Sequence, residues 1–154
     1  MTIKRYGGGM IWEVSASPTT TGTAWTGPWT VIPQVMGTIT LPGGTATKID
    51  ITTHDDIITY GKIRQNAGGI ADVTDPGGSI LWDPDDTVHQ KLLAAFQAGS
   101  VFQFRFTFAS STGVVTKKYG AMGQVSIGNG TSDINGYVTY PVTVVANTVN
   151  FNVA

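Results

Sequence analysis

A length of 154 residues indicates one domain with a single hydrophobic core. Only 12% of the residues are charged, against about 25% in a typical soluble domain, and the net charge of −1 gives no basic field that would attract nucleic acid. The chain has no cysteine, which excludes a disulfide framework and a thiolate metal site, and its 20 glycines and many threonines favour strands and turns.

The N-terminal third is predicted to form short strands around a polar loop. Residues 1–9 are expected to form an N-terminal arm, and they lack the apolar run of a secretory signal. Residues 10–14 form a first strand, and residues 15–28, rich in Ser, Thr, Gly and Pro, form either a flexible arm or a surface loop. Further strands are predicted at 29–35 and 38–41, followed by a turn at Pro42-Gly43-Gly44.

A strand with strict alternation and a long polar segment come next. Residues 47–53 alternate, which places Ile49 and Ile51 on the inward face. Residues 54–78 are rich in glycine and poor in apolar side chains, so we predict a long loop or extended hairpin, and such segments are usually functional. We expect this segment to order on assembly and to contact adjacent subunits. The polar side chains that would make these contacts are His54, Asp55, Asp56, Lys62, Arg64, Asp72 and Asp75.

One helix is predicted, centred on residues 89–96. Thr87 is the expected N-cap of a capping box, and Gly99 suits the left-handed residue that ends a helix. His89 is expected on the helix surface. An apolar stripe at helical spacing indicates that one face of the helix packs on a sheet. This stripe consists of Val88, Leu92, Leu93 and Phe96.

The most regular strand follows the helix, at residues 101–108. Its alternation places Phe102, Phe104, Phe106 and Phe108 on one face, and Gln103, Arg105 and Thr107 on the other. Each buried aromatic side chain contributes about 2–3 kcal/mol, so this strand is expected to anchor the core. The complete predicted core is Ile49, Ile51, Leu92, Leu93, Phe96, Phe102, Phe104, Phe106 and Phe108.

The C-terminal third is predicted to consist of strands at 114–119, 121–127, 136–145 and 149–153. Pro141 cannot donate to a ladder, so its strand should lie at an edge or carry a bulge there. The predicted fold is mainly β: a β-sandwich or barrel with one packed α-helix, in a single domain over residues 1–154. No stretch approaches the roughly 20 apolar residues of a membrane helix, so we expect no membrane insertion and synthesis in the cytoplasm.

No group of residues provides the elements of a catalytic or metal site. His54 and His89 lie in different predicted elements without a nearby Glu or Cys, whereas zinc requires three or four ligands. Asp83, Asp85 and Asp86 lack the spacing and distal Glu of a calcium loop, and we interpret them as turn and N-cap residues. We therefore expect no metal, no cofactor and no enzymatic activity.

The low charge content has its own implication for the surface. A soluble monomer normally keeps a charged coat, so this composition indicates that copies of the chain cover much of its exterior. A neutral β-domain that stays monomeric is the alternative. Its four tryptophans would then form a sugar-binding platform on a β-sandwich, rather than filling the core and the subunit contacts. These residues are Trp12, Trp25, Trp29 and Trp82.

The order of motifs over residues 29–108 resembles that of the tail tube (major tail) proteins of long-tailed, non-contractile bacteriophages. The matching motifs are Trp29-Thr30-Val31-Ile32-Pro33, Thr38-Ile39-Thr40-Leu41-Pro42-Gly43-Gly44 and Lys48-Ile49-Asp50-Ile51-Thr52-Thr53-His54-Asp55-Asp56, then Gly68-Gly69-Ile70, Trp82-Asp83-Pro84-Asp85, the His89-to-Gly99 helix and the aromatic strand. Each motif is weak alone, and their order and spacing carry the resemblance.

The resemblance implies a structural virion protein of the phage tail. Its subunits would join their inner sheets into a hexameric β-barrel, and the rings would stack around a tape-measure protein, between tail terminator and distal tail proteins. The tube would conduct double-stranded DNA during genome ejection without specific binding. Four strands from each of six subunits give a barrel of about 50 Å diameter. The tube protein of a contractile injection system is the alternative within the same fold.

Overall fold

The computed structural model describes residues 10–19, 24–25, 27–46, 48–50, 66–68, 72–109, 116–151 and 153. Within these residues the chain is mainly β, as predicted, with one helix, α2 (Thr87–Ala98). The strands are β1 (Ile11–Ser15), β2 (Trp29–Val31), β3 (Val35–Thr40), β4 (Gly43–Thr45), β5 (Lys48–Asp50), β6 (Asn66–Gly68), β7 (Asp72–Thr74), β8 (Gly77–Leu81), β9 (Val101–Ala109), β10 (Thr116–Ile127), β11 (Thr131–Ser132) and β12 (Val138–Asn150).

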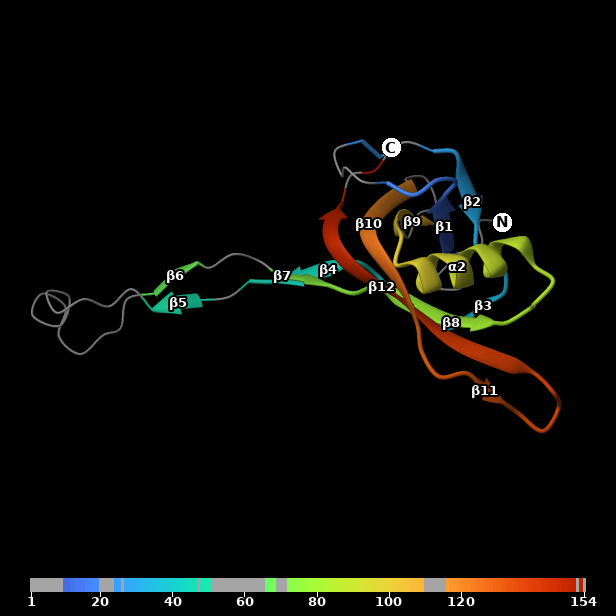
Figure 1. The fold of residues 1–154 in the computed structure, drawn as a ribbon. Helices are drawn as coiled ribbons and strands as arrows, with labels where there is room; N and C mark the ends of the chain where they lie inside the picture. The colour runs from blue at the N-terminus through green and yellow to red at the C-terminus, as the bar shows by residue number, and fades with distance from the viewer. Residues whose placement is uncertain are drawn as a thin grey trace, which may run out of the picture.

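The main sheet is antiparallel and curls around the core (Figure 1). Its strand order is β2-β1-β9-β10-β12-β8-β3, and β11 pairs with β12. The two edge strands, β2 and β3, are consecutive in sequence. The short link between them bonds to both ends of the sheet, because Ile32 N donates to Trp12 O at 2.8 Å and Leu81 N donates to Gln34 O at 2.9 Å. The strands β2 and β3 do not pair with each other, so the sheet is not closed by strand pairing. The link between them instead connects the two ends of the sheet.

The longest strands, β10 and β12, carry the curl. Their pairing shifts register between Met122 and Gly123. A Cβ at Gly123 would lie only 2.0 Å from Val145 O, so no other residue fits this close approach without backbone movement. Pro141 does not lie in an edge strand, contrary to the prediction, since β12 pairs with both β10 and β8. The β10 ladder ends at Val142, and just beyond it Gly128 N donates to Pro141 O at 2.9 Å, so the missing N–H of Pro141 falls at the end of this ladder.

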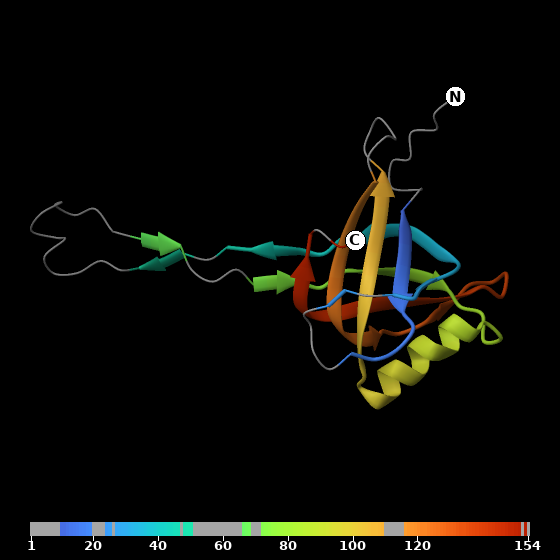
Figure 2. The same cartoon turned by 90° about the horizontal axis from the view of Figure 1, so that it is seen from above.

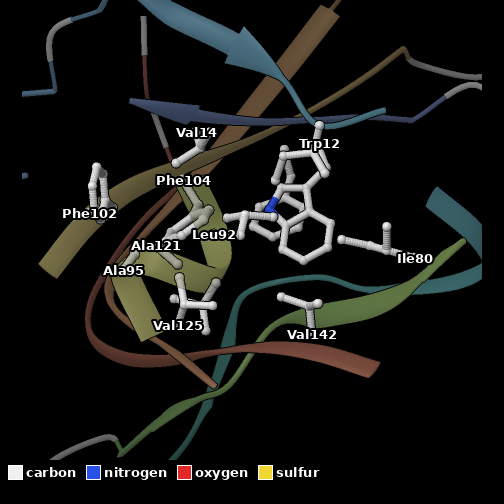
Figure 3. Close-up of a cluster of buried hydrophobic side chains, with 13 residues drawn as sticks. Trp12, Val14, Ile80, Leu92, Ala95, Phe102, Phe104, Ala121, Val125 and Val142 are labelled. Carbon is white, nitrogen blue, oxygen red and sulfur yellow. The ribbon is translucent and has the colours of Figure 1, made fainter. Parts of the chain in front are cut away.

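The core fills the inner face of the curled sheet. Trp12 stacks on Phe106, with ring centroids 5.5 Å apart and planes at 17°, and packs obliquely on Phe104 at 6.2 Å. In Figure 3 its indole lies among side chains of β8, β12 and α2. The buried cluster consists of Trp12, Val14, Ile32, Ile80, Leu92, Ala95, Phe102, Phe104, Phe106, Ala121, Val125, Val142 and Val144.

The aromatic strand behaves as predicted over most of its length. Phe102, Phe104 and Phe106 are buried, whereas Phe108 at the end of β9 is only partly buried. Phe108 instead makes an edge-to-face contact with Tyr119 at 4.9 Å, because the core does not extend to that end of the strand. The assignment of Phe108 to the core was wrong.

The opposite face of β9 is covered rather than exposed. Gln103 is buried, and its Nε2 donates to Ala24 O at 2.7 Å. On the neighbouring strand, a Cβ at Gly120 would meet the Trp25 ring at 2.7 Å and Val153 at 2.6 Å, so glycine lets both side chains pack closely. The described parts of residues 15–28 therefore form a second layer on the sheet.

The helix ends follow from local hydrogen bonding. Asp86, not the predicted Thr87, is the N-cap, because its Oδ1 accepts from Val88 N at 2.8 Å and His89 N at 3.1 Å. Gly99 ends the helix in the left-handed conformation at φ 67°, as expected. No described helix is long and apolar enough to cross a membrane.

The helix is rotated relative to the predicted packing. Its buried residues are His89, Leu92 and Ala95, which follow one another at three-residue spacing. Leu93 is turned by about 100° from Leu92 and is 38% exposed, and Phe96, on the flank of the inner face, is 43% exposed. Leu93 and Phe96 were wrongly assigned to the core, and His89 was wrongly assigned to the surface.

The described strands between residues 43 and 74 form an extended hairpin that stands out from the sheet (Figures 1 and 2). Its arms pair twice, β4 with β7 and β5 with β6, in nested antiparallel ladders. The predicted strand at 47–53 therefore belongs, where described, to this hairpin rather than to the main sheet. Ile51, His54, Asp55, Asp56, Lys62 and Arg64 lie outside the described residues, as does the predicted arm at 1–9, and the side chain of Ile49 is not described.

Candidate assembly surfaces

The outer face is uncharged where residues 124–126 of β10 lie beside the paired parts of β12, β8 and β3, whereas Lys118 lies on the same face farther back along β10. Cross-strand partners share a face, so the pairing register defines this surface. We call it the neutral sheet face. Its members are Met36, Thr40, Gly77, Ser79, Leu81, Gln124, Ser126, Thr139, Pro141, Thr143 and Val145. Two of its apolar side chains are strongly exposed, Met36 at 47% and Val145 at 50%.

The exposed side of α2 also lacks charge. The only charged residue in this helix is Lys91, and its Nζ donates to Ser15 O and lies 5.1 Å above the Phe102 ring. Partial burial lowers the pKa of Lys91 below its ordinary value. We call the remaining surface the helix outer face, which consists of Thr87, Gln90, Leu93, Ala94, Phe96, Gln97 and Ala98. A helix facing water normally carries charged or strongly polar side chains there.

A turn at the end of the β11–β12 hairpin presents a wholly exposed isoleucine. Ile134 is 100% exposed and Tyr137 is 58% exposed. The turn is internally bonded: Asp133 Oδ1 accepts from Asn135 N at 2.8 Å and Tyr137 N at 3.1 Å, and Asp133 O accepts from Gly136 N at 3.1 Å. We call residues 131–137 the Ile134 turn. Its backbone is held in place while its largest apolar side chains face solvent.

Several of the described charged side chains are engaged in local structure. Glu13 and Arg105 form an ion pair across β1 and β9, and the Arg105 guanidinium lies 4.7 Å above the Trp29 ring. The carboxylates of Asp83 and Asp86 accept from nearby backbone N–H groups. None of these charged side chains belongs to the neutral sheet face or to the helix outer face.

The predicted contact loop is described only at its C-terminal end. Asp72 and Asp75 are both exposed and lie at the base of the extended hairpin. Asp75 has a structural role, because its Oδ1 accepts from Ala146 N of β12 at 3.0 Å and ties the hairpin to the sheet. Asp72 lies in β7 and Asp75 directly follows it, and the other five residues of the predicted set lie outside the described residues.

The four tryptophans do not form a common platform. Trp12 is buried, Trp82 stacks on His89 at 5.1 Å, Trp29 lies against Arg105, and Trp25 packs on β10. Trp12 and Trp82 therefore take no part in such a surface, whereas Trp29 and Trp25 lie over Arg105 and Gly120, which are cross-strand partners. The part of the chain that the structure describes also holds no cluster of three His, Cys, Asp or Glu side chains suited to a metal.

We did not predict the neutral sheet face or the Ile134 turn from the sequence. The alternating positions 139, 141, 143 and 145 are Thr, Pro, Thr and Val, so the absence of charge along β12 was visible. Ile134 stands between the turn formers Asp133 and Asn135-Gly136, which was a second signal. No protein-family model matches this chain, and no curated protein has a significantly similar sequence. The functional assignment therefore depends on the surfaces.

Proposed function

We propose that this chain is a self-assembling structural subunit, the tail tube protein of a long-tailed bacteriophage. Six copies form a ring, and the rings stack into a hollow tube within the virion. The observation that carries the proposal is the neutral sheet face, to which four adjacent strands contribute and whose members include no charged side chain. A face of this kind is poorly suited to a monomer in water and well suited to the inside of an assembly.

The strand count supports closure into a ring. In the order β10-β12-β8-β3 neighbouring strands are antiparallel, so the first and last strands run in opposite directions. With an even number of strands per copy, β3 of one copy and β10 of the next can therefore pair antiparallel. Residues 125–127 of β10 extend past the β9 ladder, which begins at Gln124, and pair with β12 alone among the described strands. Pairing of β3 with these three residues of a neighbour would cover the open edge at β3 and so remove its aggregation risk.

The neutral sheet face has the properties that a DNA conduit requires. Six copies of four strands give a bore that passes a duplex, at about 50 Å between strand axes before side chains are added. A basic lining would hold the phosphate backbone, whereas an uncharged lining lets DNA slide. The neutral sheet face carries neither aspartate nor basic residues. A tape-measure protein would occupy the same bore before ejection, with terminator and distal tail proteins at the two ends.

Electron microscopy of the purified protein tests the proposal. Negative-stain images over a range of protein concentrations, with sedimentation velocity on the same samples, should show six-fold rings or tubes that increase with concentration. The carbohydrate-binding alternative predicts a monomer at every concentration, with binding on a glycan array. A chain that sediments as a monomer throughout, with no ring in any image, would overturn the assembly proposal.

A further inference from the structure

We propose that the Ile134 turn of one copy docks on the helix outer face of a second copy. This inference rests on the proposed self-assembly, and it names two surfaces that meet. Both lack an occupant within the molecule, since Ile134 is wholly exposed and Leu93 and Phe96 are 38% and 43% exposed. The turn beyond β11 also lies apart from α2 in Figure 1.

The shape of each surface suits the other. The Ile134 turn is a narrow projection whose backbone is fixed by the three hydrogen bonds to Asp133, so little conformational entropy is lost when it docks. Leu93 and Phe96 are three residues apart on α2 and so lie next to each other on the helix. Together they offer an apolar site for one aliphatic side chain, Ile134 of the second copy. Tyr137 of the same docked turn would lie at the margin of this site.

Charge favours this occupant over the other projection of the chain. The sequence has six charged residues between positions 48 and 64, and an ion placed on an uncharged helix face would be desolvated without a partner. The Ile134 turn contains one charged side chain, Asp133, and its Oδ1 is already bonded to two N–H groups of the turn. A neutral projection therefore matches a neutral face.

The contact joins two different patches, so it is head-to-tail. Such an interface generates a closed ring or an open filament, whereas a contact of α2 with α2 would stop at a dimer. One turn on one helix face buries far less than the roughly 800 Å² per partner of a standard stable complex. We therefore expect the contact to be weak in an isolated pair and to persist only with the other contacts of the assembly.

Cysteine cross-linking tests the contact directly, because the chain has no native cysteine. The Asn135→Cys and Gln97→Cys substitutions place thiols beside the two apolar sites without removing Ile134, Leu93 or Phe96. Treated with a short bis-maleimide under assembly conditions, the double variant should give a ladder of covalent multimers. Each single variant should stay monomeric on a denaturing gel, and an equal mixture of the two should give dimers.

Two results would overturn the inference while leaving the proposed function in place. One is assembly seen by microscopy without any ladder from the double variant. The other is a covalent dimer from Gln97→Cys alone, which would mean that α2 faces α2. If the unmodified chain never assembles, the proposed function fails first, and sedimentation separates that result from the other two.

A substitution at the turn gives an independent measurement. Ile134→Asn should raise the concentration needed for assembly about tenfold, the effect expected from leaving one aliphatic side chain unburied. Because Ile134 is wholly exposed in the subunit, the thermal unfolding of the monomer should not change. Ile134→Leu should restore assembly. An unaltered concentration dependence for Ile134→Asn would contradict the docking.

Discussion

The imidazole of His89 stacks on the indole of Trp82, with ring centroids 5.1 Å apart and planes at 21°. Both ring nitrogens also have partners: Nδ1 accepts from Asp83 N at 3.1 Å, and Nε2 donates to Pro33 O at 3.0 Å. Because Nδ1 is the acceptor, the proton lies on Nε2. A single buried ring therefore joins α2 to the end of β8 and to the link between the two sheet edges.

Replacing His89 should destabilise the subunit. His89→Ala would leave Pro33 O and Asp83 N without partners and open a cavity against Trp82, so we expect the free energy of unfolding to fall by about 3–4 kcal/mol. His89→Gln keeps one polar group and should lose less. Urea unfolding followed by tryptophan fluorescence measures both variants, and a change below about 0.5 kcal/mol for His89→Ala would contradict the assignment.

Leu92 and Leu93 form a matched pair with opposite expectations. Leu92→Ala removes a buried side chain and should lower the free energy of unfolding by about 2–5 kcal/mol. Leu93→Ala removes an exposed one and should change it by less than about 0.5 kcal/mol. Assembly should respond to Leu93→Ala even though the monomer stays stable. Equal losses of stability in both variants would show that the helix packs differently.

Gly123 and Gly99 require glycine for two different physical reasons, a close backbone contact at Gly123 and a positive φ at Gly99. A Cβ at Gly123 would overlap Val145 O, so Gly123→Ala should force β10 and β12 apart and lower the melting temperature sharply or prevent folding. Gly99→Ala meets no atom within 4 Å, and only its φ of 67° opposes the change, so the expected loss is about 1–2 kcal/mol. Thermal melts followed by circular dichroism compare the two. A milder effect at Gly123 than at Gly99 would be inconsistent with the β10–β12 register.

Shortening the extended hairpin should separate folding from assembly. Deletion of residues 61–70 removes β6 but no residue of the main sheet or the buried cluster. The shortened chain should keep its melting temperature and lose the ability to form tubes, because the hairpin is expected to contact adjacent subunits. Sedimentation velocity and negative-stain images supply the comparison. Tubes of normal length from the shortened chain would remove the hairpin from the assembly.

The periodic features of this protein were open to prediction because they depend on neighbours along the chain. The alternation of Phe102, Phe104 and Phe106 predicted a half-buried strand, and the glycine at position 99 predicted the end of the helix. The scarcity of charge is also visible in the sequence alone, and the proposed self-assembly depends on it.

Features that depend on contacts between distant segments could not be predicted in this way. The stripe on α2 spans more than one face, and only the position of the sheet decides that Leu92 is buried while Leu93 is exposed. The same holds for Gln103, which reads as a solvent-facing residue until Ala24 and Trp25 cover it. His89 is buried because Pro33 and Asp83, 56 and 6 positions away, both reach its ring.

Local spacing along this chain determined which segments would be strand or helix, because a residue's dihedral preferences and the period of its neighbours act over a few positions. Which side of each element meets water was decided only when the sheet curled and residues 24–25 and 153 packed against it. Burial is a property of the complete three-dimensional packing, so the surfaces that would join one copy to the next became visible only in the folded molecule.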